Sequence, residues 1–241
     1  MKNSIFRTGV RWVLLAVFLK ALTVQAQMLD GVPSAMVKLF GGNSFTAQGE
    51  MRVTNSSHVL ILQMPTAFAA DETKLRLDLD MKLIKSSIVA PEMIKMFVQA
   101  GKDRITSVVR PDKKMTYIIY PGAHMYSVMP LSPSDAEIAN QKLEKKQLGK
   151  ETLDGHACVK NQAVVRSPKG TVLLQATTWN ATDLKDFPIQ IEMKDNGNST
   201  ILHFMNVNLV KPDPKLFDIP AGYKEEGAPA PKAAAPAPKK K

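Results

Sequence analysis

The chain has 241 residues and a formal charge of +10, but this charge is concentrated at its two ends. Four cations lie in the first 26 residues and four follow Gly227. The region between them, residues 27–227, therefore contains 24 Lys and Arg residues and 22 acidic residues. The near-neutral central part argues against nucleic acid as a partner, and its length suits one large β domain. The single cysteine, Cys158, excludes an internal disulfide.

The first 26 residues have the pattern of a secretory signal peptide. Lys2, Arg7 and Arg11 precede an apolar run that is too short to span a bilayer, and a Val-Gln-Ala cleavage sequence ends at Ala26. We therefore expect cleavage after Ala26 and a periplasmic or secreted protein. Because the next residue is Gln27 and not Cys, we expect no N-terminal lipid anchor.

The following segment predicts a short helix over residues 33–40 and then strands over 45–53, 59–64 and 74–83. The third strand is the clearest element, because its charged residues alternate with apolar ones: Leu75, Leu77, Leu79, Met81 and Leu83. This period of two predicts a strand with one buried and one solvated face. Such strands are common in antiparallel sheets.

A helix over residues 91–100 is predicted next, with an apolar side formed by Met93, Ile94, Phe97 and Val98. Strands follow over 104–110, 115–120 and 125–129. A polar helix is predicted over 132–147, since Ser134 or Asp135 is suited to its start and lysines to its end. The second half predicts strands over 156–166, 171–179, 189–194 and 200–210, with one helical turn over 181–187.

This succession of nine or ten strands, with helices inserted singly, predicts a mainly β (α+β) fold. A sheet of that many strands must curl to bury one face, so we expect a curved antiparallel sheet or half-open β-barrel with helices covering its concave side. The predicted domain spans residues 27–226. From Gly227 the composition changes to Ala, Pro and Lys, which predicts a disordered tail over 227–241.

Three segments carry a resemblance: LGKETLDGHAC at 148–158, WNATDLKDFP at 179–188 and PKLFDIPAGY at 214–223. Over about residues 45–223 the chain resembles an exported bacterial family of unknown function within the periplasmic lipoprotein-carrier-like (LolA/LolB-like) superfamily. The resemblance implies a half-open β-barrel lined with apolar side chains. It also implies a cavity that holds acyl chains or lipids, and a protein that carries them between membranes.

The expected function is therefore a non-enzymatic binding or carrier protein for a lipid or lipidated protein. Its acyl chain would lie in an apolar cavity between the concave face and the second helix, lined by Leu75, Leu77, Leu79, Met81, Met93, Ile94 and Phe97. Each buried methylene contributes about 0.8 kcal/mol, so an acyl chain could bind without a polar anchor. We expect a monomer, and weak contact of the lysine-rich tail with anionic membranes.

Two alternatives stay open. A structural or assembly protein of the cell envelope would have a filled core and one extended apolar patch outside. An envelope hydrolase, which we favour least, would bring Asp, His and Ser within hydrogen-bonding reach at the base of the concave side. The sequence has no HExxH, CxxC, GxSxG or SxxK motif. We therefore expect neither a metal nor a cofactor, and we expect Cys158 to be a buried apolar side chain.

Overall fold

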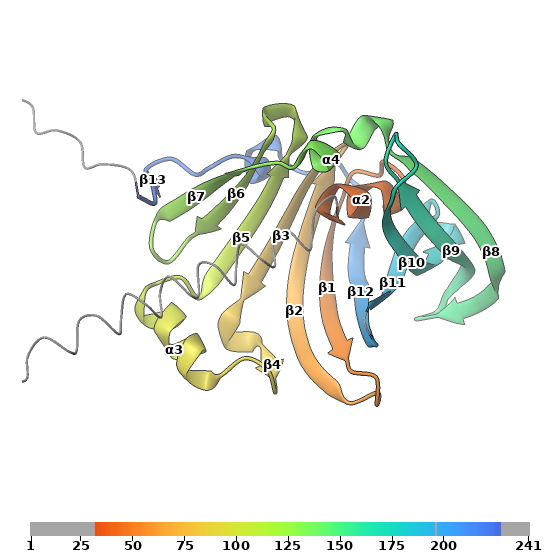
Figure 1. Ribbon diagram of the computed structural model, residues 1–241, viewed down its shortest axis with the longest axis horizontal. Coiled ribbons are helices and arrows are strands. Elements are labelled where there is room, and N and C mark those ends of the chain that lie inside the picture. The colour runs from red at the N-terminus through yellow and green to blue at the C-terminus, as the bar shows by residue number, and fades with distance from the viewer. Residues whose placement is uncertain (1–31, 196, 228–241) are drawn as a thin grey trace, which may run out of the picture.

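A computed structural model describes residues 32–195 and 197–227, which fold into one curved sheet of 13 strands (Figure 1). The predicted signal peptide, and the predicted tail beyond Gly227, lie outside the described residues. No helix within the described ranges is both long enough and apolar enough to cross a bilayer.

The strands are numbered in chain order. Their bounds are β1 Phe45–Thr54, β2 Leu60–Asp71, β3 Lys74–Asp80, β4 Lys85–Ser86, β5 Arg104–Arg110, β6 Met115–Tyr120, β7 Met125–Pro130, β8 Lys142–Leu153, β9 His156–Arg166, β10 Val172–Ala181, β11 Phe187–Asp195, β12 Asn198–Asn208 and β13 Lys224–Glu225. The helices are α2 Val32–Leu39, α3 Pro91–Gln99 and α4 Pro133–Ala136, and the 3-10 turns are η1 Met81–Leu83, η2 Pro111–Lys113, η3 Ile138–Asn140, η4 Thr182–Leu184 and η5 Pro214–Phe217.

The middle of the sheet is formed by β1 and β12, which pair with each other. From β1 the order continues through β2, β3, β5, β6 and β7, and from β12 it continues through β11, β10, β9 and β8. All of these pairs are antiparallel, while the short β13 adds to the edge of β7 in parallel and β4 pairs with β2. The predicted fold class, a mainly β curved sheet that leaves a half-open barrel, is confirmed.

Hairpin connections explain why consecutive strands are neighbours. At the β8–β9 turn, Asp154 and Gly155 both have positive φ, 51° and 83°. A two-residue turn of this kind matches the right-handed twist of the strands it joins, and Asp-Gly is one of its preferred sequences. The LDGH motif of the sequence is therefore a hairpin turn.

The predicted strand over 74–83 ends earlier than expected. The carboxylate of Asp80 accepts a hydrogen bond from the backbone N–H of Lys82 at 2.9 Å, which caps η1. Met81 and Leu83 therefore leave the strand, and the alternation of apolar residues continues for three positions beyond the sheet pairing. Residues 156–166 form a strand as predicted, and the helix predicted over 91–100 is confirmed as α3.

The helix predicted over residues 132–147 is wrong. Only α4 and η3 are helical there, and from Lys142 the chain enters β8, which pairs with β9 along its length. β8 ends the sheet and is largely exposed, so its sequence lacks the apolar alternation that identifies the other strands. Lysines, and a register shift between Gln147 and Gly149, are common on such edges, where they oppose pairing with another chain.

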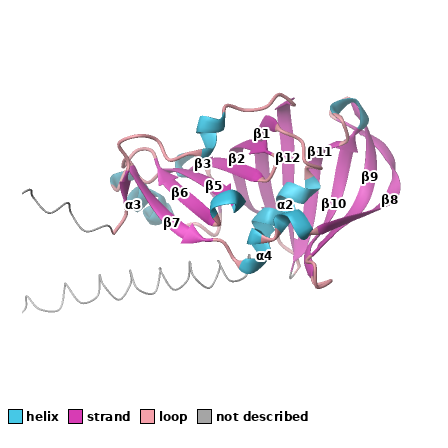
Figure 2. Cartoon of the chain, turned by 90° about the horizontal axis from the view of Figure 1, so that it is seen from above, coloured by secondary structure: helices cyan, strands magenta, loops and turns pink. Residues whose placement is uncertain are grey.

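The main core lies in the hollow of the sheet, where α2 packs (Figure 2). α2 contacts β9 and β10, and its Ala35, Val37 and Leu39 are buried. Phe40 follows the helix and packs on Phe45, with ring centres 4.8 Å apart. A helix thus covers the concave side of the β8–β12 half, as predicted, with Phe68, Phe187 and Phe204 completing the aromatic cluster.

Candidate ligand-binding face

The part of the sheet formed by β3, β5, β6 and β7 is here called the open wing. Its outer face, which points away from α2, carries buried residues. On this outer face Val108 and Ile119 are fully buried, and they pack on Phe217. Phe217 belongs to the C-terminal strap, residues 211–226, which crosses the outer face after β12. The strap adds a second, smaller core to the one that lies in the hollow.

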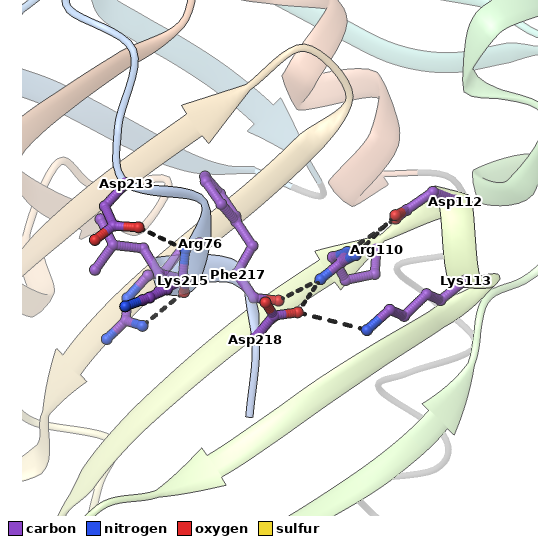
Figure 3. A network of polar contacts seen from close by, with 9 residues as sticks. Arg76, Arg110, Asp112, Lys113, Asp213, Lys215, Phe217 and Asp218 are labelled. Carbon is purple, nitrogen blue, oxygen red and sulfur yellow. Dashed lines mark hydrogen bonds and ion pairs between the residues drawn. The ribbon is translucent and has the colours of Figure 1, made fainter. Parts of the chain in front are cut away.

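Arg110 in β5 fixes the strap to the open wing (Figure 3). Its guanidinium donates to the Phe217 carbonyl at 2.7 Å and to the Asp218 carboxylate at 2.6 Å. It also forms a two-bond pair with Asp112, at 2.9 and 2.8 Å. Because these carboxylates accept hydrogen bonds from Arg110, the pKa of Asp112 and the pKa of Asp218 are lowered.

Further contacts hold the strap beside Phe217 and at its C-terminal end. Arg76 in β3, which Figure 3 shows beside the strap, donates to the Leu216 carbonyl at 2.8 Å. Arg76 also pairs with Asp78. At the other end, the Glu226 carboxylate pairs with Lys102 and accepts a hydrogen bond from the Ser127 hydroxyl at 2.8 Å. The outer face that the sequence predicts to be solvated is therefore covered on this wing.

The concave face of the open wing has the opposite character. Leu77, Ser107 and Ile118 lie side by side on adjacent strands, and Leu79 lies opposite Ile105. All five side chains are only partly buried. Buried apolar residues on the outer face, together with partly exposed apolar residues on the concave face, differ from the usual arrangement in a sheet with one solvated face. This concave face is the candidate ligand-binding face.

The structure divides the seven predicted site residues into three groups. Leu75 is 7% exposed and belongs to the core under α2, and Leu77 packs against that core. Leu79 is half-buried on the candidate face, and it also borders a groove of about 590 Å³ on the outer face whose lining includes Arg76 and Arg104. Met81 begins η1, and α3, which carries the other three residues Met93, Ile94 and Phe97, packs on η1 at the end of the sheet.

Two His–Asp pairs border a second pocket, and no motif or spacing in the sequence identifies them. His156 contacts Asp183 at 2.7 Å, and His203 contacts Asp154. The pocket, of about 460 Å³, opens where β11 and β12 separate, since their pairing ends at Gln190 and His203. In the part of the chain that the structure describes, neither imidazole forms a hydrogen bond with a hydroxyl or thiol.

Cys158 is 2% exposed, beside one of these pairs. Burial raises the pKa of its thiol, which donates to the backbone carbonyl of His156 at 3.4 Å. The hydrogen bond from His156 lowers the pKa of Asp183. Across residues 32–195 and 197–227, no cluster of three His, Cys, Asp or Glu side chains is placed to hold a metal ion.

No protein-family model matches the chain, and no curated protein matches it. Among solved structures it is similar to a LolA superfamily protein from Nitrosomonas europaea, with 10% identity and a TM-score of 0.39 over 74% of this chain and 91% of that one. The lipoprotein LppX of Mycobacterium tuberculosis matches with 11% identity and a TM-score of 0.39, over 76% of this chain and 95% of LppX. A putative outer membrane lipoprotein-sorting protein domain from Vibrio parahaemolyticus matches with 11% identity and a TM-score of 0.34, over 78% of this chain and 96% of that domain. A LolA superfamily protein is thus among the solved structures to which the chain is similar.

Proposed function

We propose that the protein is a non-enzymatic periplasmic carrier that holds an acyl chain of a lipid or lipidated protein against the concave face of the open wing. The observation that supports this proposal best is the arrangement of burial on the wing. The strap covers Val108 and Ile119 on the outer face, whereas Leu79, Ile105 and Ile118 on the concave face are only partly buried. A half-exposed apolar sheet face gains free energy when an apolar ligand covers it.

The chemistry of this face suits an acyl chain better than a polar metabolite. Apolar side chains dominate the rows that contain Leu77 and Leu79, and Ser107 is the polar residue in their middle. Such a surface recognises chain length and shape more than a headgroup, because each covered methylene contributes about 0.8 kcal/mol irrespective of its neighbours. The proposed ligand class is therefore broad in headgroup and restricted to molecules with an acyl chain.

Native mass spectrometry of the protein purified from its own cell envelope tests the proposal directly. We expect a co-purifying lipid, and we expect a fluorescent fatty acid to bind the delipidated protein. Ile118→Asp and Leu79→Asp each place a charge on the concave face and should weaken binding at least tenfold. Val172→Asp is the matched control, because Val172 is an exposed apolar residue on β10, outside the wing.

Two results would lead us to abandon the carrier function. The protein could arrive without lipid and fail to bind the fatty acid, or it could bind the fatty acid equally well in all three variants. Either result would favour a structural or assembly role in the envelope. Circular dichroism of each variant establishes that a loss of binding is not a loss of folding.

A further inference from the structure

One end of the molecule carries an unusual concentration of exposed apolar side chains. Eleven large hydrophobic residues are strongly exposed in the described chain, and six of them belong to the β1–β2 connection, the first residue of β2, η1, the loop after β4, and α3. These six residues, here called the end patch, are Val59, Leu60, Leu83, Ile88, Met96 and Val98.

Backbone contacts bring the segments of the end patch together. β4 pairs with β2 near Leu62, and the N–H of Ser87 donates to the carbonyl of Ile61 at 3.1 Å, which places Ile88 beside the start of β2. α3 packs on η1, which contains Leu83. Figure 1 shows α3, β4 and the β1–β2 connection at the same end of the sheet.

The helix in this patch is not part of either core. None of the residues of α3 is buried, and Ile88 and Met96 are 64% and 66% exposed. An apolar patch of this kind, on a helix that has no buried residue, is typical of a site of contact with another surface.

The charges at this end identify the surface. Residues 80–104 carry five Lys and Arg and three acids, and residues 55–63 carry neither. Of these cations, Lys82 pairs with Asp103 and Lys102 pairs with Glu226. Lys85 and Lys95 are exposed and form no ion pair within the described chain, and they alternate in sequence with Leu83, Ile88 and Met96. Lysines between apolar residues can extend their charged ends toward phosphates while the apolar side chains enter the acyl region.

We propose that the end patch docks the protein on a lipid bilayer that contains anionic headgroups. The patch adjoins the candidate ligand-binding face through η1, since Leu79 on β3 is followed closely by Met81 and Leu83. A docked carrier could therefore pass an acyl chain between bilayer and concave face along apolar side chains. This biological purpose rests on the proposed function, but docking itself can be measured without any cargo.

Flotation with lipid vesicles tests the proposal, using the full chain with its own tail. We expect the protein to float with vesicles of mixed phosphatidylglycerol and phosphatidylcholine, and less with phosphatidylcholine alone. The double variant Ile88→Ser/Met96→Ser should lower vesicle affinity about tenfold. Val172→Ser/Val210→Ser is the matched control, because both residues are exposed apolar side chains outside the patch. Any binding by the lysine-rich tail is equal in all of these proteins.

A second measurement does not depend on the double variant folding. An environment-sensitive dye is attached at Met96→Cys and, separately, at Val210→Cys, while the native Cys158 is buried. Only the dye at position 96 should shift to shorter emission wavelength on addition of anionic vesicles.

The proposal is overturned if patch and control variants float equally, or if both dyes respond alike. It is also overturned if the protein does not float and instead forms a dimer that Ile88→Ser/Met96→Ser dissociates, since a second copy then occupies the patch. The cargo assay remains separate, because the patch variants should still bind the fluorescent fatty acid.

Discussion

The guanidinium of Arg110 lies 2.7 Å from the carbonyl oxygen of Phe217, a residue 107 positions further along the chain. This contact joins β5 to the strap, and it is made by a side chain that is only 9% exposed. A charged side chain that is almost fully buried destabilises the folded state unless its hydrogen bonds are satisfied. The strap is therefore part of the folded domain, and its removal should be costly.

Phe217→Ala should destabilise the protein by about 3–5 kcal/mol, because a fully buried ring is lost from the outer core. Phe217→Leu retains most of the apolar volume and should cost less. Urea unfolding followed by circular dichroism measures both. If both variants unfold at the wild-type midpoint, Phe217 does not contribute to a core.

Arg110→Met should cost about 1–3 kcal/mol, because the carbonyl of Phe217 and the carboxylate of Asp218 lose their donor. Arg166→Met is the control, since Arg166 pairs with Glu144 at an exposed position. Exposed pairs contribute about 0–1 kcal/mol. Equal costs for the two substitutions would contradict the special role of Arg110.

The same contact predicts a dependence of stability on pH. Hydrogen bonds from Arg110 lower the pKa of Asp112 and of Asp218, so these carboxylates stabilise the folded state above their unfolded pKa of about 3.9. That contribution is lost as the pH falls through their lower folded pKa values. The difference in unfolding free energy between wild type and Arg110→Met should therefore shrink below about pH 4. A difference that stays constant into this acidic range would contradict the assignment.

Truncation separates the strap from the tail. Ending the chain after Glu226 should leave the thermal midpoint within about 1 °C of wild type, because a segment of Ala, Pro and Lys lacks the large apolar side chains that a core needs. Ending it after Lys211 removes Phe217 and Asp218, the partners of Arg110 in the strap, and should prevent cooperative unfolding. A fall of several degrees on removal of the tail alone would show that the tail packs on the domain.

Cys158 should be unreactive in the folded protein, since burial raises the pKa of its thiol. We expect Ellman's reagent to label the native protein at least ~100-fold more slowly than the protein in denaturant. Fast labelling of the native state would instead indicate an exposed thiolate near His156.

Strands with one buried face could be predicted from the sequence, and β3, β5, β6 and β9 lie close to their predicted positions. β8 could not, because it is largely exposed at the sheet edge and its pairing with β9, not its own pattern, makes it a strand. Its lysines and glutamates are equally suited to a solvated helix, which explains the error.

The candidate site was predictable only in part. The alternation in β3 identified the concave face, but not that α2 already covers Leu75 at one end of it. The strap was visible as an apolar motif at residues 214–223, yet its docking on the outer face depends on Arg110, more than a hundred residues earlier. No local pattern encodes such a distant contact.

The pairing of β1 with β12 has a consequence for the order in which the protein folds. Synthesis begins at the N-terminus, so β1 to β7 can form by local hairpins long before Ser199, the partner of Thr54, has been made. Until then, one edge of β1 has no neighbour, and an unpaired edge of this kind readily joins another chain. The nascent protein is thus most vulnerable to aggregation through the middle of its finished sheet, and interrupted synthesis would leave that strand permanently open.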